Sequence, residues 1–182
     1  MDCKKQGFMD NVFLELDSYK KGALGDAIVQ EMSAANVFLV LKTGEVVTPA
    51  LTRGTILPGV TRESVLKLVE MYGDELKEAM KESTGQDVVF AGSRDVSVKE
   101  FMEATEAFCT GTAAEMVPIA KLSTGVDEEP FERVFPHGQS LPGGPVTTKL
   151  LTMLRETMYG TRSIEGGAWI RNPFSPKEEF CK

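Results

Sequence analysis

A turn rich in glycine and threonine is the segment most suited to binding an anion. It reads Gly54-Thr55-Ile56-Leu57-Pro58-Gly59-Val60-Thr61-Arg62. Pro58 sets φ to about −65° and Gly59 tolerates a positive φ, so the pair predicts a type II turn. We expect Thr61 to cap the following helix, with Glu63 in its first turn. The first turn of a helix presents unpaired N–H groups, so the segment suits a phosphate, although many such turns bind nothing.

Two other segments combine polar residues with tight turns. Glu31-Met32-Ser33-Ala34-Ala35-Asn36 places an acid at the end of an apolar run, and Cys109-Thr110-Gly111-Thr112-Ala113-Ala114 forms a small-residue corner between two apolar stretches. Together with residues 54–62, and in this order, they resemble the branched-chain aminotransferases. These are pyridoxal-phosphate (PLP) enzymes of fold type IV. The resemblance runs from about Gly7 to about Trp169.

The resemblance implies a role for five residues. Glu31 would bind the pyridine nitrogen of PLP and keep it protonated. The N–H groups of Val60 and Thr61, the Thr61 hydroxyl and a second hydroxyl from Thr112 would hold the phosphate. The turn at Thr112 and Ala113 would offer N–H groups to the substrate carboxylate. Without the resemblance, the local sequence favours an ordinary acid at a strand end for Glu31. Thr61 could be a helix cap with no ligand, and Thr112-Ala113 fit a tight corner as well as a binding turn.

The resemblance assigns no catalytic residue within this chain. The lysine that attaches covalently to PLP would lie a few residues before Met1, and neither Lys4 nor Lys5 aligns with it. A redox Cys-x-x-Cys of some family members corresponds here to Ala114 and Val117. We therefore expect an enzyme part that is inactive alone.

The composition excludes several functional classes. The chain has 182 residues with a net charge of −7, which disfavours nucleic-acid binding. No apolar run is long enough to span a membrane. Three cysteines without metal spacing predict no metal site, no disulfide framework and a reducing intracellular compartment. Cys109 is expected to be a small buried residue.

The remaining patterns predict the elements that position these residues. The fold class is α+β, a mostly antiparallel sheet or pseudo-barrel packed with helices. Strands are expected at 11–17, 27–32, 36–41, 46–48, 87–90, 107–110 and 114–119. A helix should follow Thr61 and run to about Lys81, with Gly73 weakening its middle. Residues 74–86 are charged and should form an exposed helical extension or insertion. A capping box at Ser97 and Glu100 predicts a short helix that buries Phe101 and Ala104.

The last helix should begin at Gly143-Gly144-Pro145 and end at Gly160, with Val146, Leu150, Met153, Leu154 and Met158 on its buried face. Residues 1–170 are assigned to a PLP-binding large domain and 171–182 to a tail. Arg62 is expected to pair with a nearby acid, and His137 to have a surface or structural role.

Three functions are compatible with these patterns. The first is a part of a branched-chain aminotransferase, a homodimer that moves an amino group between leucine, isoleucine or valine and 2-oxoglutarate. The second is a non-catalytic module for PLP binding or dimerisation. The third is another fold type IV enzyme, such as a D-amino-acid aminotransferase or an aminodeoxychorismate lyase.

Overall fold

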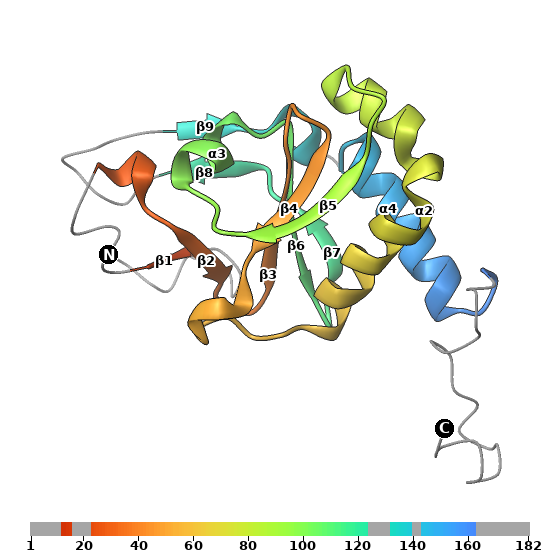
Figure 1. Cartoon of the computed structure of the whole chain (residues 1–182), viewed down its shortest axis with the longest axis horizontal. Coiled ribbons are helices and arrows are strands. Elements are labelled where there is room, and N and C mark those ends of the chain that lie inside the picture. Colours follow the sequence, from red (N-terminus) through yellow and green to blue (C-terminus); the bar gives the residue numbers. More distant parts are fainter. Residues whose placement is uncertain (1–11, 16–22, 124–131, 140–142, 163–182) are drawn as a thin grey trace, which may run out of the picture.

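A five-stranded sheet forms the middle layer of the molecule (Figure 1). The computed structural model describes residues 12–15, 23–123, 132–139 and 143–162. The order of the sheet is β5 (Phe90–Arg94), β4 (Glu45–Pro49), β3 (Asn36–Val40), β6 (Glu106–Gly111) and β7 (Glu115–Pro118). β3 pairs antiparallel with β4 and with β6, and β6 with β7, whereas β4 and β5 run parallel. The predicted α+β class with a mostly antiparallel sheet is confirmed.

Small elements cover one face of this sheet. They are β1 (Val12–Leu14), β2 (Val29–Met32), α3 (Val98–Glu103), β8 (Lys121–Ser123), β9 (Glu132–Val134) and the 3-10 turns at Leu24–Asp26 and Pro136–Gln139. β1 pairs with β2 and β8 with β9, so two further sheets surround a core that contains Phe101 and Phe135. The capping box of α3 is confirmed, with the Ser97 hydroxyl accepting from the Glu100 N–H at 3.2 Å.

Two long helices cover the other face (Figure 1). α2 (Val60–Thr84) packs along α4 (Pro145–Met158), and both bury apolar side chains against the sheet. Phe38 of β3 and Phe108 of β6 stack beneath them, with ring centroids 5.1 Å apart. Because side chains alternate between the faces of a strand, residues 106, 108 and 110 of β6 face the helices, and residues 107 and 109 face the other core.

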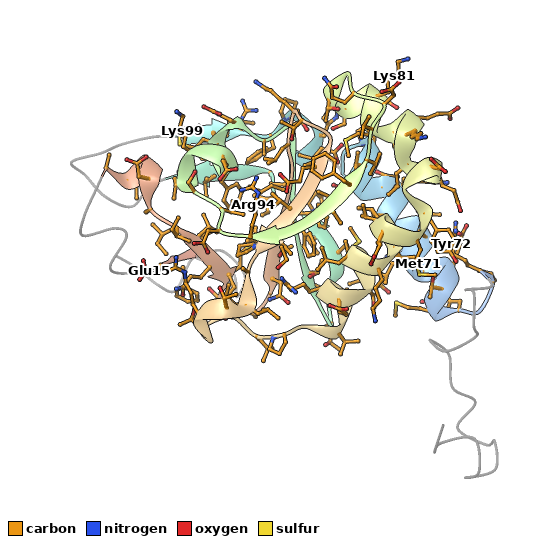
Figure 2. All side chains as sticks on the ribbon, in the orientation of Figure 1. Glu15, Met71, Tyr72, Lys81, Arg94 and Lys99 are labelled. Carbon is orange, nitrogen blue, oxygen red and sulfur yellow. The ribbon has the colours of Figure 1, made fainter. Side chains whose placement is uncertain are left out.

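α2 is kinked in its middle, where the sequence places Gly73. Tyr72 leaves helical geometry there, with φ −129° and ψ 28°. The Arg162 guanidinium lies 4.9 Å from the centroid of the Tyr72 ring and binds Glu75 and Glu156 at 2.8 and 3.0 Å. Tyr72 therefore marks the place where the kink meets the end of α4 (Figure 2).

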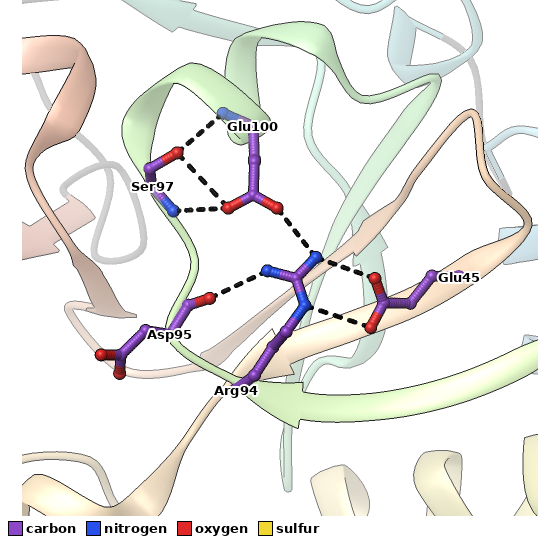
Figure 3. Close-up of polar contacts among 5 residues, drawn as sticks. All are labelled: Glu45, Arg94, Asp95, Ser97 and Glu100. Carbon is purple, nitrogen blue, oxygen red and sulfur yellow. Dashed lines mark hydrogen bonds and ion pairs between the residues drawn. The ribbon is translucent and has the colours of Figure 1, made fainter.

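Arg94 joins three elements at the end of β5 (Figure 3). Its guanidinium binds Glu45 of β4 and Glu100 of α3, each at 2.8 Å, and donates to the Asp95 carbonyl at 2.9 Å. These hydrogen bonds to Glu45 and Glu100 raise the pKa of Arg94 further above its ordinary value. The network fixes α3 against the sheet.

Several expected boundaries are wrong. β5 begins at Phe90 and not at Asp87, because the parallel ladder with β4 starts by pairing Phe90 with Glu45. α2 extends to Thr84, and its charged second half buries Leu76 and Met80 against α4 and the sheet, so it is not wholly exposed. Met158 is 52% exposed and does not belong to the buried face of α4. The boundary expected between the large domain and the tail, at residue 170, lies outside the described residues.

Candidate functional site

The start of α2 presents N–H groups that no helical bond uses. The first helical hydrogen bond runs from the Glu63 N–H to the carbonyl of Gly59 at 3.0 Å. The N–H groups of Val60, Thr61 and Arg62 precede it, and Gly59 is the N-cap, which has no side chain to bind them. The positive end of the helix dipole, equivalent to roughly half an elementary charge, lies at the same place.

Two details of this turn differ from expectation. Gly59 has φ −65°, so no type II turn with a positive φ forms there. Glycine is needed because a Cβ on Gly59 would collide with the side-chain oxygen of Asn36. Thr61 is the second residue of the helix and not its cap, so its hydroxyl does not make the expected capping bond.

Arg62 ties the start of α2 to the sheet through neutral oxygens. Its Nη2 donates to the Pro49 carbonyl at 3.0 Å and to the Ser93 hydroxyl at 2.7 Å, not to an acid as expected. Burial lowers its pKa, and the charge of Glu63 partly opposes that shift. Arg62 is only 3% exposed, so it positions the helix from behind the site.

The predicted acid lies beside the same helix end. The carboxylate of Glu31, on β2, accepts a hydrogen bond from the Leu57 N–H at 3.1 Å. On the other side of that residue, the Leu57 carbonyl accepts from the Asn36 side-chain amide at 2.9 Å. Leu57 precedes Val60 by three residues, in the loop that leads into α2. Through Glu31 and Asn36, β2 and β3 therefore hold this loop next to the acid.

Two turns close the site from the sheet side. The turn between β2 and β3 is tight, with reciprocal hydrogen bonds between Met32 and Ala35 at 2.9 and 3.3 Å. The turn between β6 and β7 approaches it so closely that a Cβ on Gly111 would lie 3.3 Å from the Ala34 carbonyl oxygen. Figure 1 shows the start of α2 next to this second turn.

These segments enclose one cavity of about 190 Å³. Its lining includes all four predicted cofactor-binding residues, Glu31, Val60, Thr61 and Thr112. Ala113, predicted to bind substrate, is exposed on the adjoining turn and does not line the cavity. Sequence reasoning gave no role to Asn36, Leu57 and Thr110, which also line it. Asn36 could have been noticed as a polar residue that opens an otherwise apolar strand.

The cavity fits PLP in its chemistry. Unused N–H groups and the helix dipole suit a phosphate, and a carboxylate suits a protonated ring nitrogen. The lining also contains a buried hydroxyl, that of Thr110, without a partner. Among the described lining residues Glu31 is the only charged one, so none of them supplies a cation for a phosphate. Among the residues that the structure describes, no group of acids, histidines and cysteines could hold a metal ion.

Comparison with known proteins agrees with this geometry. The model of the amino-transferase class IV family matches residues 1–122. This chain belongs to the class IV aminotransferases. Branched-chain-amino-acid aminotransferase 6 of Arabidopsis thaliana is 37% identical over 170 residues, which cover 93% of the chain and 38% of that protein. Methionine aminotransferase BCAT4 of the same plant is 38% identical over 122 residues, covering 67% of the chain and 28% of that protein.

Solved structures of class IV aminotransferases share the fold. The branched-chain aminotransferase of Thermobaculum terrenum in its PLP form matches with a TM-score of 0.58 and 30% identity, over 88% of this chain and 40% of that one. The resemblance to branched-chain aminotransferases is thereby confirmed, and PLP is confirmed as the cofactor that the family implies. The chain spans about a quarter to two fifths of the length of these relatives.

Proposed function

We propose that this class IV aminotransferase chain supplies the phosphate- and pyridine-binding half of a PLP site in a branched-chain amino-acid aminotransferase. The observation that supports this most is the shared cavity. Glu31, Val60, Thr61 and Thr112 come from three separate segments of the sequence, and all four line it.

Each residue has a defined task in this proposal. The N–H groups of Val60 and Thr61 and the hydroxyls of Thr61 and Thr112 donate to the phosphate. The Glu31 carboxylate, held by the Leu57 N–H, keeps the proton on the pyridine nitrogen. The N–H groups of Thr112 and Ala113 donate to the substrate carboxylate. When bound, PLP supplies an electron sink for the reacting carbon of the amino acid.

The substrates proposed are leucine, isoleucine or valine with 2-oxoglutarate. Support comes from relatives named for branched-chain amino acids, and a relative named for methionine makes that amino acid the first competitor to assay. The expected homodimer and intracellular compartment stay predictions; relatives include a mitochondrial and a chloroplastic form. None of the described helices is long and apolar enough to cross a membrane.

The test of the cofactor site is binding of PLP to the purified chain. We expect reversible binding that Glu31→Gln weakens about tenfold, because a charge-assisted hydrogen bond becomes a neutral one. Glu103→Gln, an exposed acid of α3, is the matched control and should not alter the affinity. Equal PLP affinities for wild type and Glu31→Gln would count against the assigned role of Glu31.

A turnover assay separates the enzyme part from the alternatives. We expect the chain alone to form no glutamate from leucine and 2-oxoglutarate, since no lysine in it aligns with the one that attaches to PLP. Leucine-dependent glutamate formation by the purified chain would contradict that expectation. The non-catalytic module remains the second candidate, because the same cavity would serve it.

A further inference from the structure

Thr110, the fifth residue of β6, has a buried hydroxyl that makes no hydrogen bond. The residue is 1% exposed, and its Oγ1 has no hydrogen-bond partner within the part of the chain that the structure describes. The other buried threonines in the described part of the chain are all satisfied. Thr48 donates to the Val37 carbonyl at 2.8 Å, and Thr147 and Thr157 bind at 2.7 and 2.8 Å. An unmade hydrogen bond at a buried hydroxyl lowers stability, so this exception calls for a partner.

The position of Thr110 indicates which partner. Thr110 lies opposite Asn36 in the ladder between β6 and β3. It shares the helix-facing side of β6 with Phe108, which packs in the core beneath α2 and α4. Thr110 also lines the cavity together with Gly59, Val60 and Thr61. Thr110 therefore lies at the end of the cavity where α2 begins.

The charge balance of the cavity favours a further donor there. The described residues of its lining include the acid Glu31 and no cationic side chain. What the described lining offers to an anion is backbone N–H groups, the dipole of α2 and hydroxyl donors. A hydrogen bond from a hydroxyl to a charged phosphate oxygen is stronger than one to a neutral acceptor.

We propose that the Thr110 hydroxyl is an additional ligand of the phosphate group bound at the N-terminus of α2. The proposal rests on the function proposed above and adds a donor that the family resemblance did not supply. In the ligand-free chain the hydroxyl lowers stability, and on binding it donates to a phosphate oxygen. Removing the hydroxyl should consequently raise the stability of the ligand-free chain and weaken its binding of phosphate.

The test removes the hydroxyl without changing the size of the side chain. Thr110→Val should raise the melting temperature of the ligand-free chain. It should weaken binding of inorganic phosphate and of PLP about tenfold, the effect of losing a hydrogen bond to a charged group. Binding of pyridoxal, which has no phosphate, should not change. Thr110→Ser should bind phosphate and PLP like wild type.

Thr48→Val is the matched control, because Thr48 is equally buried in β4 but makes its hydrogen bond. It should lower the melting temperature and leave all three affinities unchanged. Wild-type affinity of Thr110→Val for phosphate and PLP would overturn the proposal while leaving the roles of Glu31 and Thr61 intact. Equal weakening of PLP and pyridoxal would also overturn it. A wild-type chain that binds neither phosphate nor PLP would remove the proposed function as well.

Discussion

At the scale of single residues, burial decides which reactive groups are available. Cys109 is a free thiol in β6, 2% exposed and facing the core on the side away from α2 and α4. Burial raises the pKa of its thiol to about 11. A thiol with that pKa is almost fully protonated at neutral pH and is a poor nucleophile. The expectation that Cys109 is a packing residue agrees with this environment.

Alkylation tests the protection of Cys109. In the native chain at pH 7.5, iodoacetamide should leave Cys109 unmodified over an hour, whereas in urea it should react fully. Peptide mass spectrometry reports the extent of modification at each cysteine. Native modification of Cys109 at the rate seen in urea would show that β6 is not buried in solution.

At the scale of elements, α4 depends on a buried acid from the neighbouring sheet. The Glu106 carboxylate is 2% exposed and accepts from the N–H groups of Val146 and Thr147 at 3.1 and 2.9 Å, and from the Thr147 hydroxyl at 2.7 Å. Gly144 lets the helix start come this close, since a Cβ there would collide with the carboxyl group. The acid supplies the cap that the helix lacks, as Gly144 has no capping side chain.

Glu106→Gln should therefore destabilise the chain. The glutamine amide group places N–H donors opposite the N–H and hydroxyl donors of Val146 and Thr147. The free energy of unfolding should therefore decrease by about 2 to 4 kcal/mol. Urea denaturation measures it, with the exposed Glu103→Gln as control, expected within about 0.5 kcal/mol of wild type. A wild-type midpoint for Glu106→Gln would show that the contact adds no stability.

The hydrogen bonds that Glu31 and Asn36 make with the backbone of Leu57 connect the acid of the site to the loop before α2. Asn36→Leu removes the side-chain amide that binds the Leu57 carbonyl and leaves that carbonyl with the backbone hydrogen bond from the Gly59 N–H, while the Glu31 carboxylate still binds the Leu57 N–H. We expect PLP affinity to fall by about tenfold, because both the acid and the approach to α2 lose their fixed position. Fluorescence titration with PLP measures this. If the affinity stays unchanged, the hydrogen bond from Asn36 is not needed to form the site.

At the scale of the whole molecule, local sequence patterns predicted the helices and strands better than the tertiary contacts between them. Alternation and capping signals were sufficient for β3, α3 and the start of α4, because each depends on neighbouring residues. The start of β5 and the burial of Leu76 depend on partners distant in sequence, and both were missed. At the site, the three motifs predicted which residues meet. They did not reveal the contact of Asn36 with Leu57 or the unpaired hydroxyl of Thr110.

Ion pairs between distant elements make global stability depend on pH. Partial burial alone would raise the pKa of Glu100, but hydrogen bonds from Arg94 and the Ser97 N–H outweigh it, so the net pKa is below the ordinary value. The hydrogen bond from Arg162 likewise lowers the pKa of Glu75. The unfolded chain then binds more protons than the folded one, so stability is complete above the ordinary glutamate pKa and falls as the pH drops through the folded value.

Unfolding in urea at pH 7, 5, 4 and 3 should show this loss. The urea concentration at the midpoint of unfolding should decrease as the pH drops from 5 to 3. Glu100→Gln should be less stable than wild type at pH 7, but its stability should decrease less on acidification. Glu103→Gln is the control and should follow the wild-type pH profile. If Glu100→Gln showed the pH dependence of the wild type, the ion pair between Glu100 and Arg94 would not be a cause of the loss of stability at low pH.

A nitrogen–proton NMR titration of the labelled chain with PLP tests directly whether the cavity at the start of α2 binds the cofactor. The backbone amide signals of Val60, Thr61, Gly111 and Thr112 should shift together with one affinity, while signals of the second half of α2 should not shift. Shifts confined to another surface, such as the groove between α2 and β5 lined by Val88 and Phe90, would contradict binding in that cavity.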